Sequence, residues 1–388
     1  MANQAMQDLP AVHESRRRWR TAIITMMTGR TLEACVESGR DNILQLRLMA
    51  ALMVVLGHSN IGGPGSIRYD PVNYFLPHTW VHPIGLMIFF TISGFLISLS
   101  FVRRPQLLRF LRARALRLWP ALIVCLVLCA FVLGPWLTSV PLHEYFSTSR
   151  PDNPYLYVAY RASMLKGVNE LPGLFRTTTS VAPGAVNTPL WSLVVEATMY
   201  LWVAGAGVLR LFRFPWLTSI GIATLFSVTL LWPMIQGIAP PYVLMIEGFF
   251  GAGAIACLLR RHIPVSTGLM LLLAAACFAA RNSVHATPFT WLAVAYFVFW
   301  FSYVPRLPPM PYQADLSYGA YIWAWPVQQT VVLLTHLNEP LYIFAITLIF
   351  LLPISAASWF FIEKPALRLK DRRRFRTARR DLAESVAI

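Results

Sequence analysis

Charged side chains are scarce in this sequence of 388 residues. Asp, Glu, Lys and Arg together make up 13% of the chain, whereas hydrophobic residues make up 56%. Because about a quarter of the residues in a soluble domain are charged, this composition excludes an ordinary soluble enzyme. The apolar residues instead form repeated runs of about 17–25 residues, which is the length of a helix that crosses a bilayer.

Cysteine is also rare, with five residues at positions 35, 125, 129, 257 and 277. None of them lies in an expected outer loop, so the sequence predicts no disulfide framework. Two stand four residues apart in one apolar run, where packing is a commoner role than metal ligation, and we predict no metal site. The sequence also lacks an internal repeat.

We therefore predict an all-α, polytopic integral membrane protein with about ten transmembrane helices. Residues 1–40 are assigned to a cytoplasmic tail, 41–364 to the transmembrane domain and 365–388 to a basic cytoplasmic tail. The long outer loop, 139–187, is expected to form short interfacial helices, since structureless loops of this length are uncommon. The expected spans are residues 43–61, 82–102, 118–138, 188–209, 215–233, 241–259, 265–281, 288–304, 315–334 and 340–361.

The few charges are distributed unevenly along the chain. There are 33 Lys and Arg residues against 17 Asp and Glu, which gives a net charge of +16. With both termini in the cytoplasm, 27 of the 33 basic residues fall on the cytoplasmic side and 6 outside, as the positive-inside rule requires. The basic blocks are interpreted as orientation signals and contacts with anionic membrane lipids, so nucleic acid is not an expected partner.

The first expected span, "LRLMAALMVVLGHS", contains two residues that are costly in hydrocarbon, Arg47 and His58. Eleven helical steps separate them, so their side chains differ by only about 20° in direction and by about 16 Å along the helix axis. Snorkelling of the arginine and a satisfied buried histidine would explain each residue alone. Their alignment on one face favours a functional pair.

Small and basic residues follow at the cytoplasmic side. Ser93 and Gly94 in "FFTISGFLI" could let two helices approach closely or let a thin linear ligand pass between helices. Arg114 and Arg117 in "RFLRARALRLWP" project from the same side of a helix. They could bind phosphates or belong to the positive-inside cluster.

Two carboxylates lie within expected spans, Glu196 in "NTPLWSLVVEATMYLWV" and Glu247 in "YVLMIEGFFGAG". We place Glu196 at about the depth of His58, where a carboxylate could orient a general base. A structural polar contact between helices is the alternative for both residues. In "DLSYGAYIWAWPVQQ" and "WFFIEKPALRLK" we assign mainly structural roles, with Tyr321 as a candidate cavity residue.

Together these segments resemble the bacterial membrane-bound acyltransferase-3 family, which O-acetylates sugars of lipopolysaccharides, capsules and exopolysaccharides. Arg47 and His58 match the family's spacing of Arg or Lys, ten residues and His. The segments "FFTISGFLI", "RALRLWP", "NTPLWSLVVEATMYL", "SYGAYIWAWP" and "FIEKP" follow in the expected order, so that the resemblance covers about residues 40–366. Many relatives have a histidine at the position of Ala324, which leaves His58 as the only candidate base deep in a span.

The resemblance implies a donor site that faces the cytoplasm. Acetyl-CoA or another short acyl-CoA would be the donor, and its phosphates would suit Arg47, Arg114 and Arg117. Its pantetheine arm would pass Ser93 and Gly94 and bring the thioester towards the outer half of the membrane.

The resemblance also implies an acceptor that is handled from the other side of the membrane, and for that side we hypothesise the following roles. His58 would act as the general base and Glu196 as the catalytic carboxylate that fixes its tautomer. Trp191, Glu247 and Tyr321 would contact the acceptor, a cell-envelope or exported glycan or a lipid-linked saccharide, at the bacterial inner membrane. A relay through an acylated histidine is the alternative to direct transfer.

Two other functional classes use buried polar residues of these types. A transporter or flippase for an anionic or sugar substrate is the main alternative, although the sequence shows no paired Gly/Pro-broken helices in matching halves. A non-catalytic membrane assembly subunit would give the alignment of Arg47 and His58 no purpose.

Overall fold

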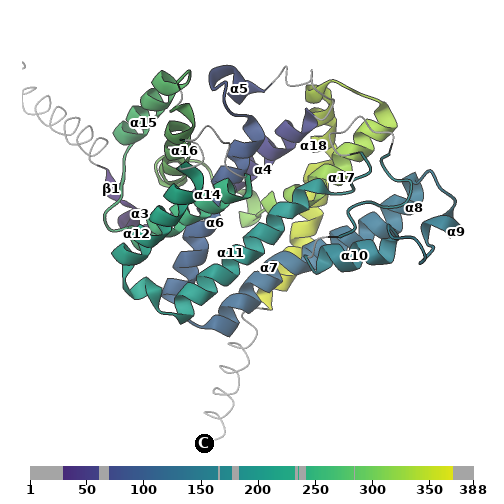
Figure 1. Cartoon of the computed structure of the whole chain (residues 1–388), viewed down its shortest axis with the longest axis horizontal. Coiled ribbons are helices and arrows are strands. Elements are labelled where there is room, and N and C mark those ends of the chain that lie inside the picture. The colour runs from purple at the N-terminus through teal and green to yellow at the C-terminus, as the bar shows by residue number, and fades with distance from the viewer. Residues whose placement is uncertain are drawn as a thin grey trace, which may run out of the picture.

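The computed structural model describes residues 29–60, 70–164, 167–176, 183–231, 235, 242–283 and 285–369. Across these ranges the fold is helical (Figure 1). Strand pairing within them is limited to an antiparallel contact between β1 (Arg30–Thr31) and β2 (Pro264–Val265) and one isolated bridge. The all-α prediction is therefore confirmed.

Each of the ten expected spans contains a helix. The π-helical turns η2 (Cys129–Leu133), η5 (Ser227–Leu231) and η7 (Ser358–Glu363) continue three of them. The α-helices are α3 (Leu32–Glu37), α4 (Ile43–Ser59), α5 (Pro71–Phe75), α6 (Val81–Arg103), α7 (Leu107–Leu128), α8 (Gly134–Leu137), α9 (Leu142–Tyr145), α10 (Pro154–Ala162), α11 (Trp191–Val208), α12 (Pro215–Phe226), α14 (Tyr242–Leu258), α15 (Thr267–Ala280), α16 (Ala286–Tyr303), α17 (Ser317–Thr335), α18 (Pro340–Ala357) and α19 (Lys364–Arg368).

Four helical stretches of the described chain are long and apolar enough to cross a membrane: Val81–Arg103, Leu107–Leu137, Thr188–Val208 and Pro340–Arg368. Four more apolar helices are shorter, and α4 is one of them. Its 17 residues extend about 26 Å, slightly less than a hydrocarbon core of about 30 Å. The apolar helices support a membrane protein, and the count of ten spans and the orientation of the termini stay predictions.

Helix α6 lies at the centre of the bundle, in contact with α4, α14, α11 and α16. Glycines explain how closely it packs: a Cβ atom on Gly94 would collide with the Phe250 carbonyl of α14, and one on Gly253 would collide with the Thr91 carbonyl of α6. Gly94 therefore has the packing role that small residues often have between helices, because its lack of a side chain lets the backbones of α6 and α14 approach.

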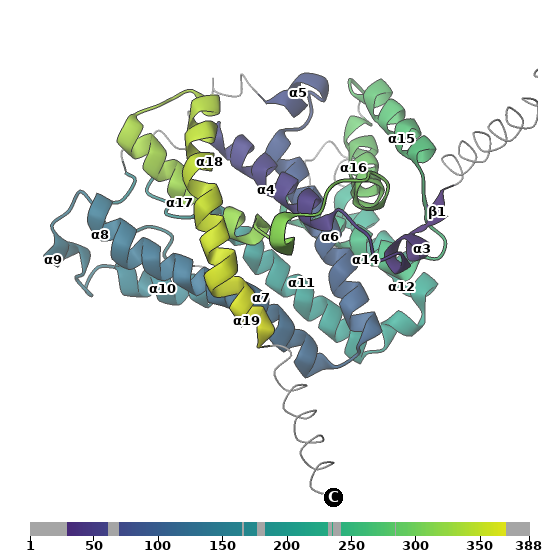
Figure 2. The same ribbon diagram turned by 180° about the vertical axis from the view of Figure 1, so that it is seen from behind.

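Helix α17 packs against α4 and α18. Figure 2 shows α18 continuing into α19 as one long helix on that side of the molecule. The ends of α4, α6, α11 and α17 that carry the predicted polar residues converge in the interior. This convergence positions the candidate site.

The outer loop contains the short helices α9 and α10, which lie with α8 at one side of the bundle (Figure 1). Helix α10 packs along α7, and Trp119 Nε1 donates a hydrogen bond to the Ala162 carbonyl at 3.0 Å. Arg150 pairs with Glu144 and Asp152 at the tip. The described part of this loop thus packs against the bundle as a helical extension.

The end of the predicted N-terminal tail belongs to the packed structure. Helix α3 lies within residues 1–40, and its Leu32 is fully buried in a small core with Phe95 and Phe299. The preceding residues 1–28, and residues 370–388 of the predicted C-terminal tail, lie outside the described chain.

Candidate functional site

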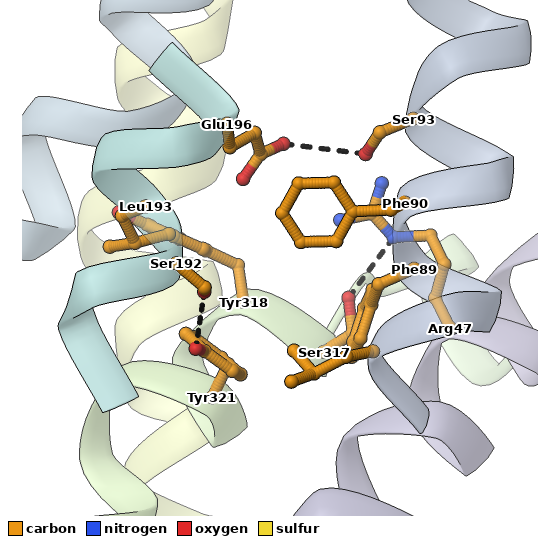
Figure 3. Close-up of a pocket in the computed structure, with 11 residues that line it drawn as sticks. Arg47, Phe89, Phe90, Ser93, Ser192, Leu193, Glu196, Ser317, Tyr318 and Tyr321 are labelled. Carbon is orange, nitrogen blue, oxygen red and sulfur yellow. Dashed lines mark hydrogen bonds between the residues drawn. The ribbon is translucent and has the colours of Figure 1, made fainter. Parts of the chain in front are cut away.

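A pocket opens between α4, α6, α11 and α17, with about 420 Å³ of empty volume that includes some open solvent. Figure 3 shows four elements sending side chains into one space. The lining residues are Arg47, Leu86, Phe89, Phe90, Ser93, Ser192, Leu193, Glu196, Ser317, Tyr318 and Tyr321.

Arg47 supplies the positive charge of the pocket. Its Nε donates a hydrogen bond to Ser317 Oγ at 3.1 Å and lies 3.5 Å from Asp315 Oδ2. In the part of the chain that the structure describes, its two terminal nitrogens make no hydrogen bond or ion pair. This edge of the guanidinium is therefore available to an anionic group of a ligand.

Glu196 faces Arg47's end of the pocket. Its Oε1 accepts a hydrogen bond from Ser93 Oγ at 3.3 Å and another from the Tyr200 hydroxyl. Ser93 lies eleven residues along α6 from His82, or about 16 Å along the helix axis, and the His82 ring is the one next to His58. The expectation that Glu196 lies beside His58 is thus corrected, because α11 presents Glu196 to the opposite half of α6.

Arg117 lies behind the pocket and is paired with two carboxylates. Its Nη2 lies 2.6 Å from Asp315 Oδ2, and its Nη1 lies 3.2 Å from Glu363 Oε2. Ser358 Oγ donates to the other oxygen of Glu363 at 2.9 Å. The predicted phosphate ligand Arg117 is therefore engaged in an ion-pair network that joins α7, the segment before α17 and η7, which agrees with the structural role expected for the last two segments.

Arg114 also points away from the lining of the pocket. Its guanidinium carbon lies 5.9 Å from the ring centres of both Phe110 and Tyr200. Its Nε is buried without a hydrogen-bond partner in the described structure, and it is attracted by Glu196. Arg114 thus adds positive charge next to the pocket without lining it.

The three residues predicted to contact the acceptor do not lie together in the pocket. Tyr321 lines the pocket, donates to the Pro189 carbonyl at 2.6 Å and shares a hydrogen bond with Ser192. Trp191 instead packs on Tyr242 with ring centres 5.6 Å apart. Glu247 is half-buried on α14, outside the pocket lining, and makes no hydrogen bond or ion pair to any described residue.

His58 lies outside the pocket lining. Its ring is edge-on to Trp325 at 5.3 Å between centres and lies 5.7 Å from the ring of His82. Its Nδ1 is shielded from solvent and has no hydrogen-bond partner among the described residues. The pocket reaches Leu86, which is four residues or about 6 Å along α6 from His82.

Several residues of the pocket and of the surroundings of His58 were not predicted from the sequence. His82 stands at the beginning of an expected span, so the criterion that selected His58 would have selected it too. Its position corrects the expectation that His58 is the only base in this region. Ala324 is buried in a cluster with Ala51 and Val55, where it fills space between helices. Ser192 and Ser317 carry no signal that distinguishes them from other small polar residues.

No group of three or more His, Cys, Asp or Glu side chains in the described ranges is arranged to hold a metal ion. The pocket offers instead a cationic edge at Arg47, the carboxylate of Glu196, hydroxyl groups of serine and tyrosine, and an apolar wall of Leu86, Phe89 and Phe90. Such a combination suits a ligand with an anionic part and an apolar or extended part.

The comparisons with known proteins point to one activity class. The family model described as "Acyltransferase domain" matches residues 41–360. The chain is 27% identical over 339 residues to a protein of Shigella phage Sf6 named "O-acetyl transferase", covering 82% of this chain and 93% of that protein. It is 25% identical over 369 residues to "Nodulation protein 10" of Rhizobium leguminosarum bv. viciae, covering 85% and 94%. No solved structure matches the chain.

Proposed function

Because the chain belongs to the acyltransferase-domain family over residues 41–360, we propose that it is a membrane-embedded O-acetyltransferase. It moves an acetyl group from cytoplasmic acetyl-CoA to a hydroxyl of a cell-envelope or exported glycan, or of its lipid-linked precursor, at the bacterial inner membrane. The name of the phage relative supports O-acetyl transfer. The proposal depends mainly on Arg47, whose terminal guanidinium nitrogens make no hydrogen bond to a described residue. Arg47 lines the pocket and belongs to α4, the helix that also bears His58.

In this proposal the pocket receives the donor. Arg47 binds an anionic phosphate group of acetyl-CoA with its terminal nitrogens, and Arg114 adds attraction from behind Glu196. The wall of Phe89 and Phe90 covers the pantetheine arm. Ser93 and Ser192 offer hydroxyl groups to the amides of that arm.

The acetyl end must travel from the pocket to His58. Leu86 is the lining residue of α6 nearest to His82 in sequence, so about 6 Å of helix separates the pocket wall from the level of the two histidines. Close packing of Gly85 against Ala50 and Val54 fills the direct line between α4 and α6. The proposed path of the arm runs instead on the side of Phe89 and Tyr321, which both line the pocket.

The reaction transfers the acetyl group from the sulfur of CoA to the oxygen of the acceptor hydroxyl. His58 removes the proton of the acceptor hydroxyl, whose oxygen forms a bond to the thioester carbonyl carbon. The carbon–sulfur bond breaks, CoA leaves as the thiolate, and the proton held by the histidine passes to that sulfur. His58 lies half-buried between aromatic rings, which position it for this step.

Direct transfer and an acyl-histidine relay differ in whether the acetyl group is ever bound to the protein. A single turnover with radioactive acetyl-CoA, quenched before the acceptor is added, separates the two. We expect direct transfer and therefore no labelled protein. A labelled His58 peptide would replace direct transfer with the relay.

The activity itself is tested with washed membranes that contain the protein, incubated with acetyl-CoA labelled in the acetyl group. We expect the label to appear in base-labile ester linkage on glycan. A transporter would instead move label or sugar into the vesicle lumen without forming an ester. Vesicles that accumulate substrate but form no labelled ester would therefore contradict the proposal.

A further inference from the structure

A second imidazole, absent from the mechanism above, lies next to His58. His82 stands in the first turn of α6, and the two ring centres are 5.7 Å apart at an interplanar angle of 33°. Gly57 makes this approach feasible, because a Cβ atom at that position would collide with the Cβ of His82. The two helices are thus shaped to bring these rings together.

A buried carboxylate, Asp70, binds the backbone next to His82. Asp70 is 5% exposed, and its Oδ1 accepts backbone hydrogen bonds from Val72 and Asn73 at 2.9 and 3.0 Å. Its Oδ2 accepts the Val81 backbone N–H at 2.8 Å, immediately before His82. Electrostatic attraction links the carboxylate to the His82 ring.

The charges of Asp70, His82 and His58 determine the direction in which a proton is drawn. Among the described residues, Asp70 attracts positive charge on His82, and the His58 ring lies 5.7 Å from the His82 ring. Two adjacent imidazoles repel each other when both carry a proton, so the pair favours holding one at a time. Within the described ranges the carboxylate of Asp70 acts on His82, so positive charge formed on His58 is drawn towards His82.

We infer that His82 and Asp70 are positioning residues that act through His58: His82 shares the proton that His58 removes from the acceptor hydroxyl, and Asp70 stabilises the charge that results. This inference rests on the proposed function, in which His58 is the general base. The proton leaves the pair for the sulfur of CoA, so that each turnover returns both rings to their starting state.

Asp70 also caps α5 through Val72 and Asn73, so a purely structural role for the group must be separated from the proposed one. Asp70→Asn keeps the side-chain oxygen that caps the helix and removes both the charge and the acceptor of the Val81 N–H, so its thermal unfolding temperature is measured beside its activity. His82→Gln keeps a polar side chain of similar length. His78→Gln is the matched control, because His78 lies near the same end of α6 and contacts Thr290 at 2.8 Å.

The kinetic test measures kcat and KM for acetyl-CoA in purified full-length protein, together with insertion into the membrane. We expect His82→Gln to lower kcat about 100-fold and Asp70→Asn to lower it about 10-fold, with KM unchanged because the donor pocket is elsewhere. We expect the His78→Gln protein to match the parent. In a His58→Ala background, His82→Gln should cause no further loss, since the two residues act as a unit.

A folding defect is separated from the proposed role by chemical rescue. His82→Ala protein should regain activity when imidazole is added, and His78→Ala protein should not change. Loss of kcat in both His82 variants without rescue by imidazole would overturn the inference in favour of packing, as would a His82→Gln protein as active as His78→Gln. If His58→Ala is itself fully active, the proposed function fails instead.

Discussion

Oδ2 of Asp315 lies 2.6 Å from Nη2 of Arg117, and the two side chains are only 10% and 13% exposed. Arg117 belongs to α7, and Asp315 lies two residues before the start of α17. This pairing distinguishes Arg117 from Arg47, although the sequence predicted both as phosphate ligands. Arg117 is neutralised within the protein, whereas Arg47 keeps its terminal nitrogens turned to the pocket.

Replacing Arg117 tests the structural role of this pair. Arg117→Met leaves Asp315 and Glu363 buried without their shared cation, which costs about 3–5 kcal/mol when a buried pair is broken. We expect a large drop in the thermal unfolding temperature of the detergent-solubilised protein. Arg109→Met, at an exposed position of the same helix, is the control. An unchanged unfolding temperature with weakened acetyl-CoA binding would restore Arg117 as a phosphate ligand.

Replacing Arg47 tests the donor pocket. A hydrogen bond to a charged group contributes about 1.5–3 kcal/mol, so Arg47→Ala should weaken acetyl-CoA binding about 10-fold to 100-fold. Stability should change less than in Arg117→Met, because Asp315 keeps its closer partner. Isothermal titration with acetyl-CoA measures the effect, with exposed Arg112→Ala as the control. Equal affinities of the two variants would remove Arg47 from the donor site.

The sequence predicted this charged region in its parts and missed its pairing. Arg47 and Tyr321 could be selected because polar groups are rare in apolar spans, and both line the pocket. The partners of Arg117 come from residues about 200 positions later in the chain. Spacing along one helix says which face a residue occupies and nothing about the helix that covers that face.

The small-residue motif gives a sharper comparison between two glycines in helices. Gly94→Ala would place a methyl group against the Phe250 carbonyl, whereas a Cβ atom on Gly205 meets no atom within 4 Å. Overpacking costs about 1–3 kcal/mol, so we expect Gly94→Ala to lower the unfolding temperature and Gly205→Ala to leave it or raise it slightly. Equal behaviour of the two variants would show that α6 and α14 can separate at this point.

Ser93 and Gly94 were predicted together as a ligand passage, but adjacent residues of a helix face different neighbours. The two side positions point in different directions, Ser93 towards Glu196 and Gly94 towards α14. Consecutive residues of a helix are about 100° apart, so one motif can serve a pocket and a helix contact at once. The depth of Glu196 was misjudged for a related reason, since helix tilt is set by packing.

The outer loop should respond to acid. Arg150 donates hydrogen bonds to Asp152 at 2.9 and 3.2 Å, and these bonds hold the pKa of the Asp152 carboxyl below its usual value. A lowered pKa stabilises the folded loop above the ordinary pKa of about 3.9. That contribution is lost as the pH falls through the folded-state pKa.

Hydrogen exchange in α9 and α10, measured between pH 6 and the acid limit of the protein (the lower value about 3), follows this loss. We expect faster opening of these helices at the acid end in the parent, and a weaker dependence on pH in Asp152→Asn. An identical pH dependence in both proteins would show that the ion pairs at the tip do not control the loop.

The most direct measurement of the central claim compares His58→Ala with His143→Ala, a substitution of an exposed histidine in the outer loop. Both proteins are quantified in the membrane and assayed for ester-linked label transferred from acetyl-CoA to glycan. The account predicts normal insertion of both, transfer at the parental rate by His143→Ala, and a loss of at least about 100-fold in His58→Ala. Transfer by His58→Ala at the rate of the control would contradict the assignment of His58 as the base.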